Sequence, residues 1–105
     1  MNFNSYYSEL DWLKSQKYYH GSSSNVKIKD NTLLPSLQTG NIREQSLGQV
    51  YVTTSYGSAK KYSYKAANKF GGEPIVYEVE PDFDSLVHRV DCEYICDFAT
   101  IIKEA

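Results

Sequence analysis

The sequence is poor in cysteine, in net charge and in long apolar runs. Its 105 residues include two cysteines and carry a net charge of −2 at pH 7. No apolar run approaches the ~20 residues that a membrane-spanning helix needs, and the N-terminus lacks the basic and then apolar pattern of a secretory signal. We therefore expect a cytoplasmic protein with no membrane partner. A charge this close to zero also gives no reason to expect nucleic acid as an obligatory partner.

The two cysteines, Cys92 and Cys96, are four residues apart. In a strand they would share a face but lie about 13 Å apart, which exceeds the reach of a disulfide. No second pair of cysteine and histidine ligands lies nearby in the sequence, so we expect no zinc or other metal site. We predict that both cysteines are buried, reduced thiols, as is usual in a cytosolic protein.

Apolar residues make up 41% of the chain, which is typical of a soluble globular fold. A chain of 105 residues is long enough for one hydrophobic core and too short for two, so we expect residues 1–105 to form a single domain. Periodicity and turn residues predict an α+β fold in which two helices pack on mostly antiparallel strands, with a turn at 21–25 and a long irregular loop at 30–48. The predicted helices cover residues 4–14 and 57–69, and Gly71-Gly72 ends the second of them. The predicted strands cover 17–20, 49–53, 74–80, 85–90, 92–98 and 100–103, and residues 26–28 are either a brief strand or the lead-in to a turn.

The stretch from residue 49 to residue 62 changes from a strand period to a helix period. Residues 49–53 alternate as an extended chain does, and Thr54 or Ser55 can cap the helix that follows. This change brings Tyr51 and Tyr62, eleven residues apart, to one corner between strand and helix. A flat ligand fits between two such rings.

The predicted helix at 57–69 contains four lysines and no acid. The helical period puts Ala59, Tyr62 and Ala66 on one face and most of the lysines on another. A solvated basic face is the simpler interpretation, and we favour it. The alternative is a local anion site that meets a phosphate or an acidic partner. The lysines are Lys60, Lys61, Lys65 and Lys69.

Three short motifs place polar or aromatic groups at strand positions next to a glycine or a helix start. Taken singly, each has an ordinary structural explanation: a histidine at a strand end, aromatic residues of the core, and a glutamate on a solvated strand face. Their joint occurrence in this order is more specific than any one of them. The motifs are Tyr18-Tyr19-His20-Gly21-Ser22, Tyr51-Val52-Thr53 followed by Ala59-Lys60-Lys61-Tyr62, and Glu93-Tyr94-Ile95.

This ordered set resembles the ADP-ribosyltransferase family, and specifically its His-Tyr-Glu branch, which includes diphtheria toxin and the poly-ADP-ribose polymerases. That branch has Tyr-His-Gly-Ser/Thr as its first motif, two tyrosines eleven residues apart in its second, and a strand beginning Glu-Tyr-Ile or similar as its third. The first motif and the segment Val50–Thr53 are also similar to the small rifampin ADP-ribosyltransferases. The resemblance covers residues 17–102. It implies a split, strongly bent β-sandwich with NAD in the cleft between its halves.

The resemblance also implies roles for individual residues. His20 would hydrogen-bond a ribose hydroxyl of NAD, and the Gly21 backbone would hold the nicotinamide amide. Tyr51 and Tyr62 would hold the nicotinamide ring between them, and Glu93 would bind the nicotinamide ribose and prepare it for reaction. The expected catalytic residues are Glu93, His20 and Tyr51, and the expected NAD-binding residues are His20, Gly21, Ser22, Tyr51, Thr53 and Tyr62.

The chemistry of the reaction explains why these residue types are needed. Cleavage of the bond between nicotinamide and ribose produces an oxocarbenium-like centre, as in glycoside hydrolysis. A carboxylate beside that centre stabilises the developing positive charge. A neutral histidine can donate to or accept from ribose hydroxyls, and stacked rings hold the leaving nicotinamide in a fixed geometry.

Two positions depart from the family pattern. Ser58-Ala59-Lys60 replaces the serine with which the polymerases grip the nicotinamide amide, so Thr53 or Ser55 would have to do so here. In the rifampin enzymes the third polar residue is an aspartate that follows a strand ending Val-Glu-Pro. In this chain Asp82 and Asp84 follow Val79-Glu80-Pro81, so either aspartate is an alternative to Glu93.

We therefore expect an NAD-dependent mono-ADP-ribosyltransferase that modifies a macromolecule, most simply a protein, in the manner of a small bacterial or phage effector. One alternative is transfer to a small molecule of the rifamycin type. The other is a non-catalytic module that binds NAD or an ADP-ribosylated partner in the same cleft.

Overall fold

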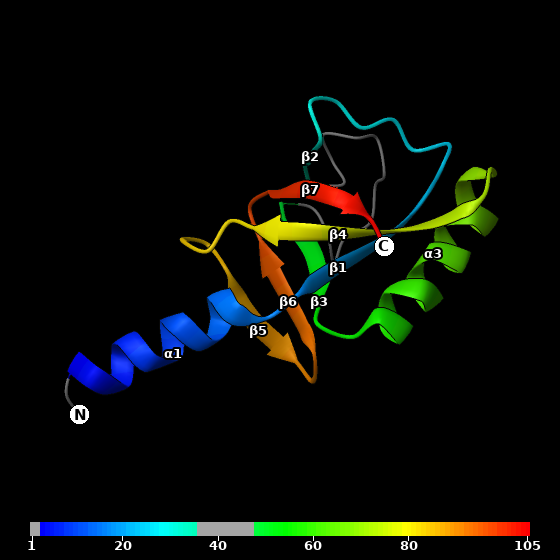
Figure 1. The fold of residues 1–105 in the computed structure, drawn as a ribbon. Helices are drawn as coiled ribbons and strands as arrows, with labels where there is room; N and C mark the ends of the chain where they lie inside the picture. Colours follow the sequence, from blue (N-terminus) through cyan, green and yellow to red (C-terminus); the bar gives the residue numbers. More distant parts are fainter. Residues whose placement is uncertain (1–2, 36–47) are drawn as a thin grey trace.

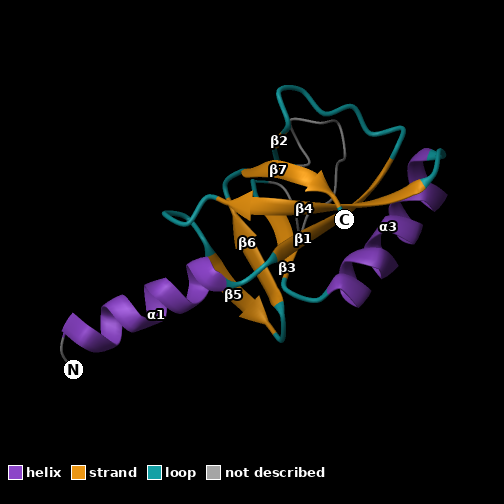
Figure 2. Cartoon of the chain, in the orientation of Figure 1, coloured by secondary structure: helices purple, strands orange, loops and turns teal. Residues whose placement is uncertain are grey.

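The computed structural model describes residues 3–35 and 48–105 of the chain. Within these residues helices and antiparallel strands combine in an α+β fold, as the sequence predicts (Figure 1; Figure 2). No helix in the described part is long and apolar enough to cross a membrane. The elements are α1 (Phe3–Ser15), β1 (Tyr18–Ser23), β2 (Thr32–Leu33), β3 (Val50–Thr53), α3 (Tyr56–Phe70), β4 (Pro74–Pro81), β5 (Val87–Val90), β6 (Glu93–Cys96) and β7 (Ala99–Glu104).

Several predicted boundaries are wrong, and strand pairing explains why. Residues 21–23 were predicted to begin a turn, but they continue β1 because the strand pairs with β4 along its whole length. Of the two interpretations of residues 26–28, the lead-in to a turn is correct: no strand forms there, and the short β2 that follows the turn pairs with β7. The predicted strand at 92–98 stops at Cys96 because β6 pairs with β3 only that far, and β7 begins at Ala99. Of the predicted loop at 30–48, residues 36–47 lie outside the described residues.

The seven strands form one antiparallel sheet in the order β2-β7-β4-β1-β3-β6-β5. Strands β1 and β3 are the neighbours with the shortest pairing in this sheet. Strand β1 pairs with β4 from Tyr18↔Val79 to Ser23↔Pro74, but it pairs with β3 only at Tyr19↔Thr53. In Figure 1, β4 and β7 run across the direction of β5 and β6. The sheet therefore bends, and it opens between β1 and β3 beyond a single residue pair.

Helix α3 has clear start and stop signals. The Ser55 hydroxyl caps its first turn by accepting a hydrogen bond from the Ser58 N–H at 3.1 Å, which settles the choice that the sequence left open between Thr54 and Ser55. At the other end Gly71 and Gly72 have φ angles of 78° and 76°, a region that glycine enters without strain. The sequence predicted this stop correctly.

Helix α3 packs on the sheet through very small residues. Ala59 and Ser63 are almost fully buried, and they face Gly21 of β1. A Cβ atom on Gly21 would overlap the Ala59 carbonyl oxygen and would lie 2.7 Å from the Ser63 amide nitrogen. Both of these are backbone atoms, so no rotamer change can make room. Gly21 is therefore required for the helix to approach the strand.

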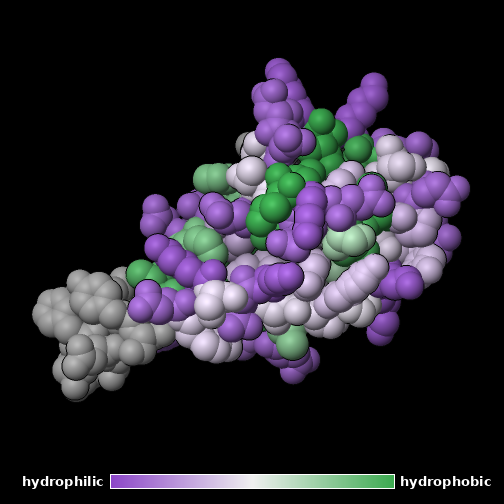
Figure 3. Space-filling model, in the orientation of Figure 1, coloured by the Kyte–Doolittle hydropathy of each residue, from purple (hydrophilic) through white to green (hydrophobic). Residues whose placement is uncertain are grey.

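The other helix, α1, was predicted to pack on the strands, but it extends away from the sheet (Figure 1). Its last turn joins the core through Leu13, whose carbonyl accepts a hydrogen bond from the Tyr18 hydroxyl at 2.7 Å. Trp12 is 54% exposed. In Figure 3 hydrophilic residues cover most of the visible face, and apolar surface gathers near β7 and β4.

The prediction of two buried thiols is half right. Cys96 is buried in the core, and burial raises the pKa of its thiol to about 11. Cys92 is exposed, because it belongs to the turn that joins β5 to β6 and not to the strand. Both cysteines are free thiols.

The contact between α3 and β1 can be tested with Gly21→Ala. We expect the free energy of unfolding to fall by about 3 kcal/mol or more, because overpacking against fixed backbone cannot relax. Urea unfolding measures this loss. Gly57→Ala in the first turn of α3 is the matched control: its added Cβ meets nothing closer than 3.8 Å, so stability should stay the same or rise slightly. A Gly21→Ala protein as stable as the wild type would contradict the close approach.

Candidate functional site

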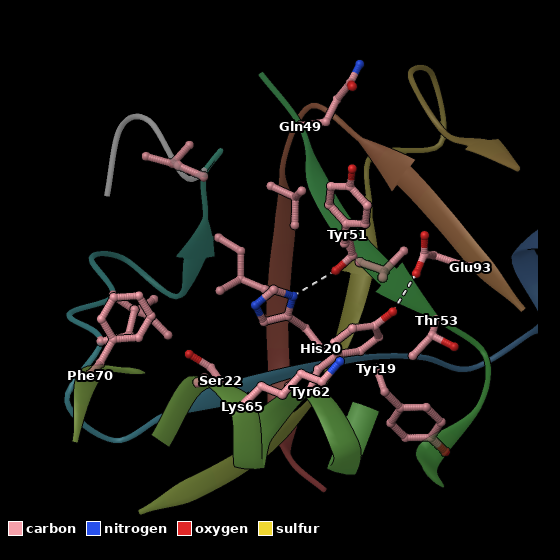
Figure 4. Close-up of a pocket in the computed structure, with 18 of the residues that line it drawn as sticks. Tyr19, His20, Ser22, Gln49, Tyr51, Thr53, Tyr62, Lys65, Phe70 and Glu93 are labelled. Carbon is pink, nitrogen blue, oxygen red and sulfur yellow. Dashed lines mark hydrogen bonds between the residues drawn. The ribbon is translucent and has the colours of Figure 1, made fainter. Parts of the chain in front are cut away.

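A cavity of about 360 Å³ lies where the sheet opens between β1 and β3, with α3 forming one wall. All seven residues that the resemblance assigned to the site line this cavity: His20, Gly21, Ser22, Tyr51, Thr53, Tyr62 and Glu93. They come from β1, β3, α3 and β6 and are spread over more than seventy positions of the sequence. Figure 4 shows them around one space.

Tyr62 and Glu93 are in direct contact. The Tyr62 hydroxyl donates a hydrogen bond of 2.8 Å to Oε2 of Glu93, across the gap between α3 and β6 (Figure 4). This bond, followed by burial, raises the pKa of Tyr62. The carboxylate is largely sheltered, with 18% of its side chain exposed. The alternation predicted for this strand is confirmed at its centre, since Tyr94 and Cys96 are buried on the opposite face.

Arg89 is a site residue that the sequence analysis missed. Its Nη1 lies 3.3 Å from Oε1 of Glu93 and donates to the Tyr51 hydroxyl at 3.0 Å. Its guanidinium carbon is 5.2 Å from the centre of the Tyr51 ring, in a cation–π contact. Arg89 lies at a register shift between β5 and β6, and the regular pairing that precedes the shift, Val87↔Ile95 and His88↔Tyr94, already leads to Glu93 as its neighbour on β6. The only signal in the sequence was its opposite charge four residues before Glu93.

His20 lies at the opening of the sheet, where a hydrogen bond fixes its ring. Its Nδ1 lies 2.8 Å from the backbone carbonyl oxygen of Tyr51 (Figure 4). A carbonyl only accepts, so Nδ1 carries the proton and Nε2 of the neutral ring is a hydrogen-bond acceptor. Burial lowers the pKa of His20, and the bond to Tyr51 opposes that shift only in part. The ring is therefore neutral at pH 7 and can accept a hydrogen bond from a ligand hydroxyl.

The hydroxyls of Ser22 and Thr53 differ in their hydrogen bonds within the protein. The Ser22 side chain is buried, and its hydroxyl points into the cavity in Figure 4. The Thr53 oxygen accepts a hydrogen bond from the Ser55 N–H at 3.0 Å, and Ser55 itself caps α3. Of the two residues considered for the nicotinamide amide, Thr53 lines the cavity and retains its proton as a donor, whereas Ser55 has a structural role.

The two alternative carboxylates lie elsewhere. Asp82 and Asp84 follow β4 and do not line the cavity. Asp82 instead organises its own turn, where its carboxylate accepts a hydrogen bond from the Ser85 hydroxyl at 2.7 Å. Glu93 is therefore the carboxylate that the fold brings to His20, Tyr51 and Tyr62.

The predicted division of α3 into an apolar and a basic face is wrong in one respect. Lys65 and Lys69 line the cavity together with Tyr62 and Ala66. The residues buried against the sheet are Ala59 and Ser63, so the cavity face and the buried face are different sides of the helix. Lys60 and Lys61 are exposed, as expected for a solvated surface.

No group of three or more histidine, cysteine or acidic residues within residues 3–35 and 48–105 is arranged to hold a metal ion. What the cavity offers instead is one oriented carboxylate, one neutral histidine, three tyrosine rings and several basic side chains. This set suits an organic ligand with hydroxyls, a flat ring and negative charge.

The lowered pKa of His20 predicts how stability depends on pH. The unfolded chain takes up a proton near the ordinary histidine pKa of 6.5, while the folded protein does not until a lower pH. The free energy of unfolding should therefore be highest above pH 6.5 and fall as the pH drops below it. His20→Gln should reduce this acid loss in urea unfolding. The control His88→Gln leaves the burial of His20 unchanged and should retain the loss; an equal change in both variants would contradict the assignment.

No protein-family model matches the chain, and no curated protein matches it in sequence.

Proposed function

We propose that the protein is an ADP-ribosyltransferase that transfers ADP-ribose from NAD to a macromolecular acceptor, in the first place a protein. The observation that carries the proposal is the meeting of His20, Tyr51, Tyr62 and Glu93 around one cavity. These residues come from three separate motifs, and the order of those motifs along the chain resembles that of the His-Tyr-Glu transferases. Chance placement of all four around a single 360 Å³ space would be unusual.

The proposal includes the split β-sandwich expected for such an enzyme. Two features support it: the single residue pair between β1 and β3, and the change of strand direction from β4 and β7 to β5 and β6 (Figure 1). The cavity lies at this opening, so a ligand there touches both halves of the sheet. His20 then spans the opening, because its ring is bonded to the Tyr51 carbonyl on the other half.

The contacts of Arg89 suggest where the nicotinamide ring binds. The guanidinium is a flat cation over the Tyr51 ring, and the nicotinamide ring of NAD is also flat and positively charged. Such a ring would gain the same cation–π attraction in that position. Arg89 comes from the exposed β5, and 44% of its side chain is accessible, so it has room to move aside.

In the proposed reaction, the bond between C1′ of the nicotinamide ribose and the ring nitrogen breaks. Its electron pair moves into the ring, which leaves as neutral nicotinamide. Glu93 stabilises the positive charge that develops at the ribose, and the hydrogen bond from Tyr62 keeps its carboxylate oriented. The acceptor nucleophile then bonds to C1′ and loses its proton to solvent.

Incubation of the purified protein with lysate and with NAD labelled in its adenylate half tests the proposal. We expect a labelled protein band and equimolar release of nicotinamide, and both should be strongly reduced with Glu93→Gln. NAD consumed only when a rifamycin is present would identify a small-molecule transferase. NAD bound but never consumed would identify a binding module, and absence of NAD binding in calorimetry would refute the proposal.

Replacement of Glu93 by Gln keeps the shape of the side chain and removes its charge. We expect NAD affinity to stay nearly the same and the rate of nicotinamide release to fall about 100-fold or more, the usual effect of losing one preorganised electrostatic contact. Asp82→Asn is the matched control, because that carboxylate lies outside the cavity, and it should keep full activity. Full activity in Glu93→Gln together with a loss of activity in Asp82→Asn would assign the catalytic role to Asp82.

Tyr62 has a ring and a hydroxyl with separable roles. Tyr62→Ala should weaken NAD binding by about 1–3 kcal/mol, because the stacking surface is lost. Tyr62→Phe keeps the ring but loses the 2.8 Å bond to Glu93, so affinity should change little while the rate falls by about 10-fold. Calorimetry and nicotinamide release distinguish the two effects. Equal affinity for NAD in Tyr62→Ala and wild type would exclude stacking.

A further inference from the structure

The lining of the cavity is basic, although the chain as a whole carries a net charge of −2. Among the described residues that line it, four are basic and one, Glu93, is acidic. Arg89 is paired with that carboxylate. The positive charge that remains comes from Lys27, Lys65 and Lys69. A concentration of cations inside a cavity of an acidic protein points to an anionic ligand.

Two of these lysines belong to one regular stripe of α3. Tyr62, Lys65, Ala66, Lys69 and Phe70 recur at the spacing of a single helix face, and all five line the cavity. A rise of about 1.5 Å per residue puts Lys65 and Lys69 about 6 Å apart along the helix axis. Their ammonium groups lie at different rings of this face, Lys65 at Tyr62 and Lys69 at Phe70, so the two positive charges are spread along the α3 wall.

The two lysines lie over aromatic rings and are not drawn to carboxylates. The Lys65 Nζ is 5.5 Å from the centre of the Tyr62 ring, and the Lys69 Nζ is 5.3 Å from that of Phe70. In the described part of the chain, the ion pairs are Arg89–Glu93 and Lys103–Glu78. Figure 4 shows Lys65 along the α3 side of the cavity, beside Tyr62.

Complementarity to the helix dipole explains this arrangement only in part. Lys69 is in the last turn of α3, where a positive charge is stabilising, but Lys65 is a turn earlier. The carbonyls at this end already have donors: the Phe70 carbonyl accepts from the Asn25 side chain at 3.0 Å, and the Gly71 carbonyl accepts from the Ser23 hydroxyl. The ammonium groups are therefore not needed to satisfy them.

We propose that Lys65 and Lys69 form a diphosphate-binding subsite in the α3 wall of the cavity. The identity of the ligand as NAD rests on the proposed function, whereas the diphosphate subsite rests on the charge and spacing of the lining. With nicotinamide at Tyr51 and Tyr62, the rest of the ligand extends along α3 toward Phe70, with Ser22 on the facing strand. The site thus selects a dinucleotide with a diphosphate over a nicotinamide riboside without one.

Calorimetry with three probes tests this subsite: NAD, ADP, which has a diphosphate but no nicotinamide, and nicotinamide riboside, which has no phosphate. In Lys65→Gln/Lys69→Gln we expect NAD and ADP to bind about 10-fold more weakly, from roughly 3- to 5-fold per partly exposed charge contact. Nicotinamide riboside should bind no more weakly. The matched control is Lys60→Gln/Lys61→Gln, which removes the same charge from two lysines of α3 that do not line the cavity and should leave all three affinities unchanged.

The outcomes separate the subsite from the proposed enzyme. If NAD binds equally well with and without Lys65 and Lys69, or if both double variants lose affinity alike, the subsite is refuted while the transferase stands. If ADP binding depends on the two lysines but NAD does not bind at all, the subsite stands and NAD is the wrong ligand. If the wild type binds neither probe with a diphosphate, the subsite is refuted. Both double variants replace exposed side chains, and thermal unfolding checks that they fold.

Discussion

The close approach of α3 to β1 at Gly21 is the contact on which the site depends. Because position 21 has no side chain, Ala59 and Ser63 rest directly on the strand backbone. The helix then stands near enough to β6 for the Tyr62 hydroxyl to reach Glu93 at 2.8 Å. Any larger residue would push the helix outward and lengthen that bond. Gly21 thus has a packing role that is independent of any contact between its backbone and nicotinamide.

A second constraint is the loss of pairing between β1 and β3. Beyond Tyr19↔Thr53 the two strands no longer form a ladder, and the space between them becomes the cavity. The His20 ring replaces part of the lost pairing, because it binds the Tyr51 carbonyl across the opening. This single hydrogen bond fixes the tautomer of the histidine. Burial and the geometry of the opening therefore determine what His20 can offer a ligand, and the sequence alone contains neither.

The sequence predicted what local patterns encode. The alternation at 49–53, the serine cap of α3 and the glycines after it placed Tyr51 and Tyr62 on the correct elements. The sequence-based predictions were wrong where pairing between distant strands determines the position of a residue. Arg89 reaches the site because β5 pairs with β6 beside Glu93, and Cys92 is exposed because the strand starts one residue later than its pattern suggested. The cavity face of α3 was missed as well, because helical period alone does not tell which side meets the sheet and which meets a ligand.

The charges around the cavity are separated in a way that suits the proposed reaction. The carboxylate of Glu93 is held at one end by Tyr62 and Arg89, while Lys65 and Lys69 follow along α3. A carboxylate beside phosphates would repel the ligand, and lysines beside the reacting ribose would oppose the positive charge that forms there. Because Glu93 belongs to β6 and the two lysines belong to α3, the same ligand can meet each kind of charge at a different group. Arg89 is the exception, since in the described structure it offsets Glu93 at 3.3 Å. A flat cationic ring that takes the position over Tyr51 would displace Arg89. Glu93 would then no longer be offset by Arg89, and its carboxylate would lie beside the ribose, where the proposed reaction develops positive charge.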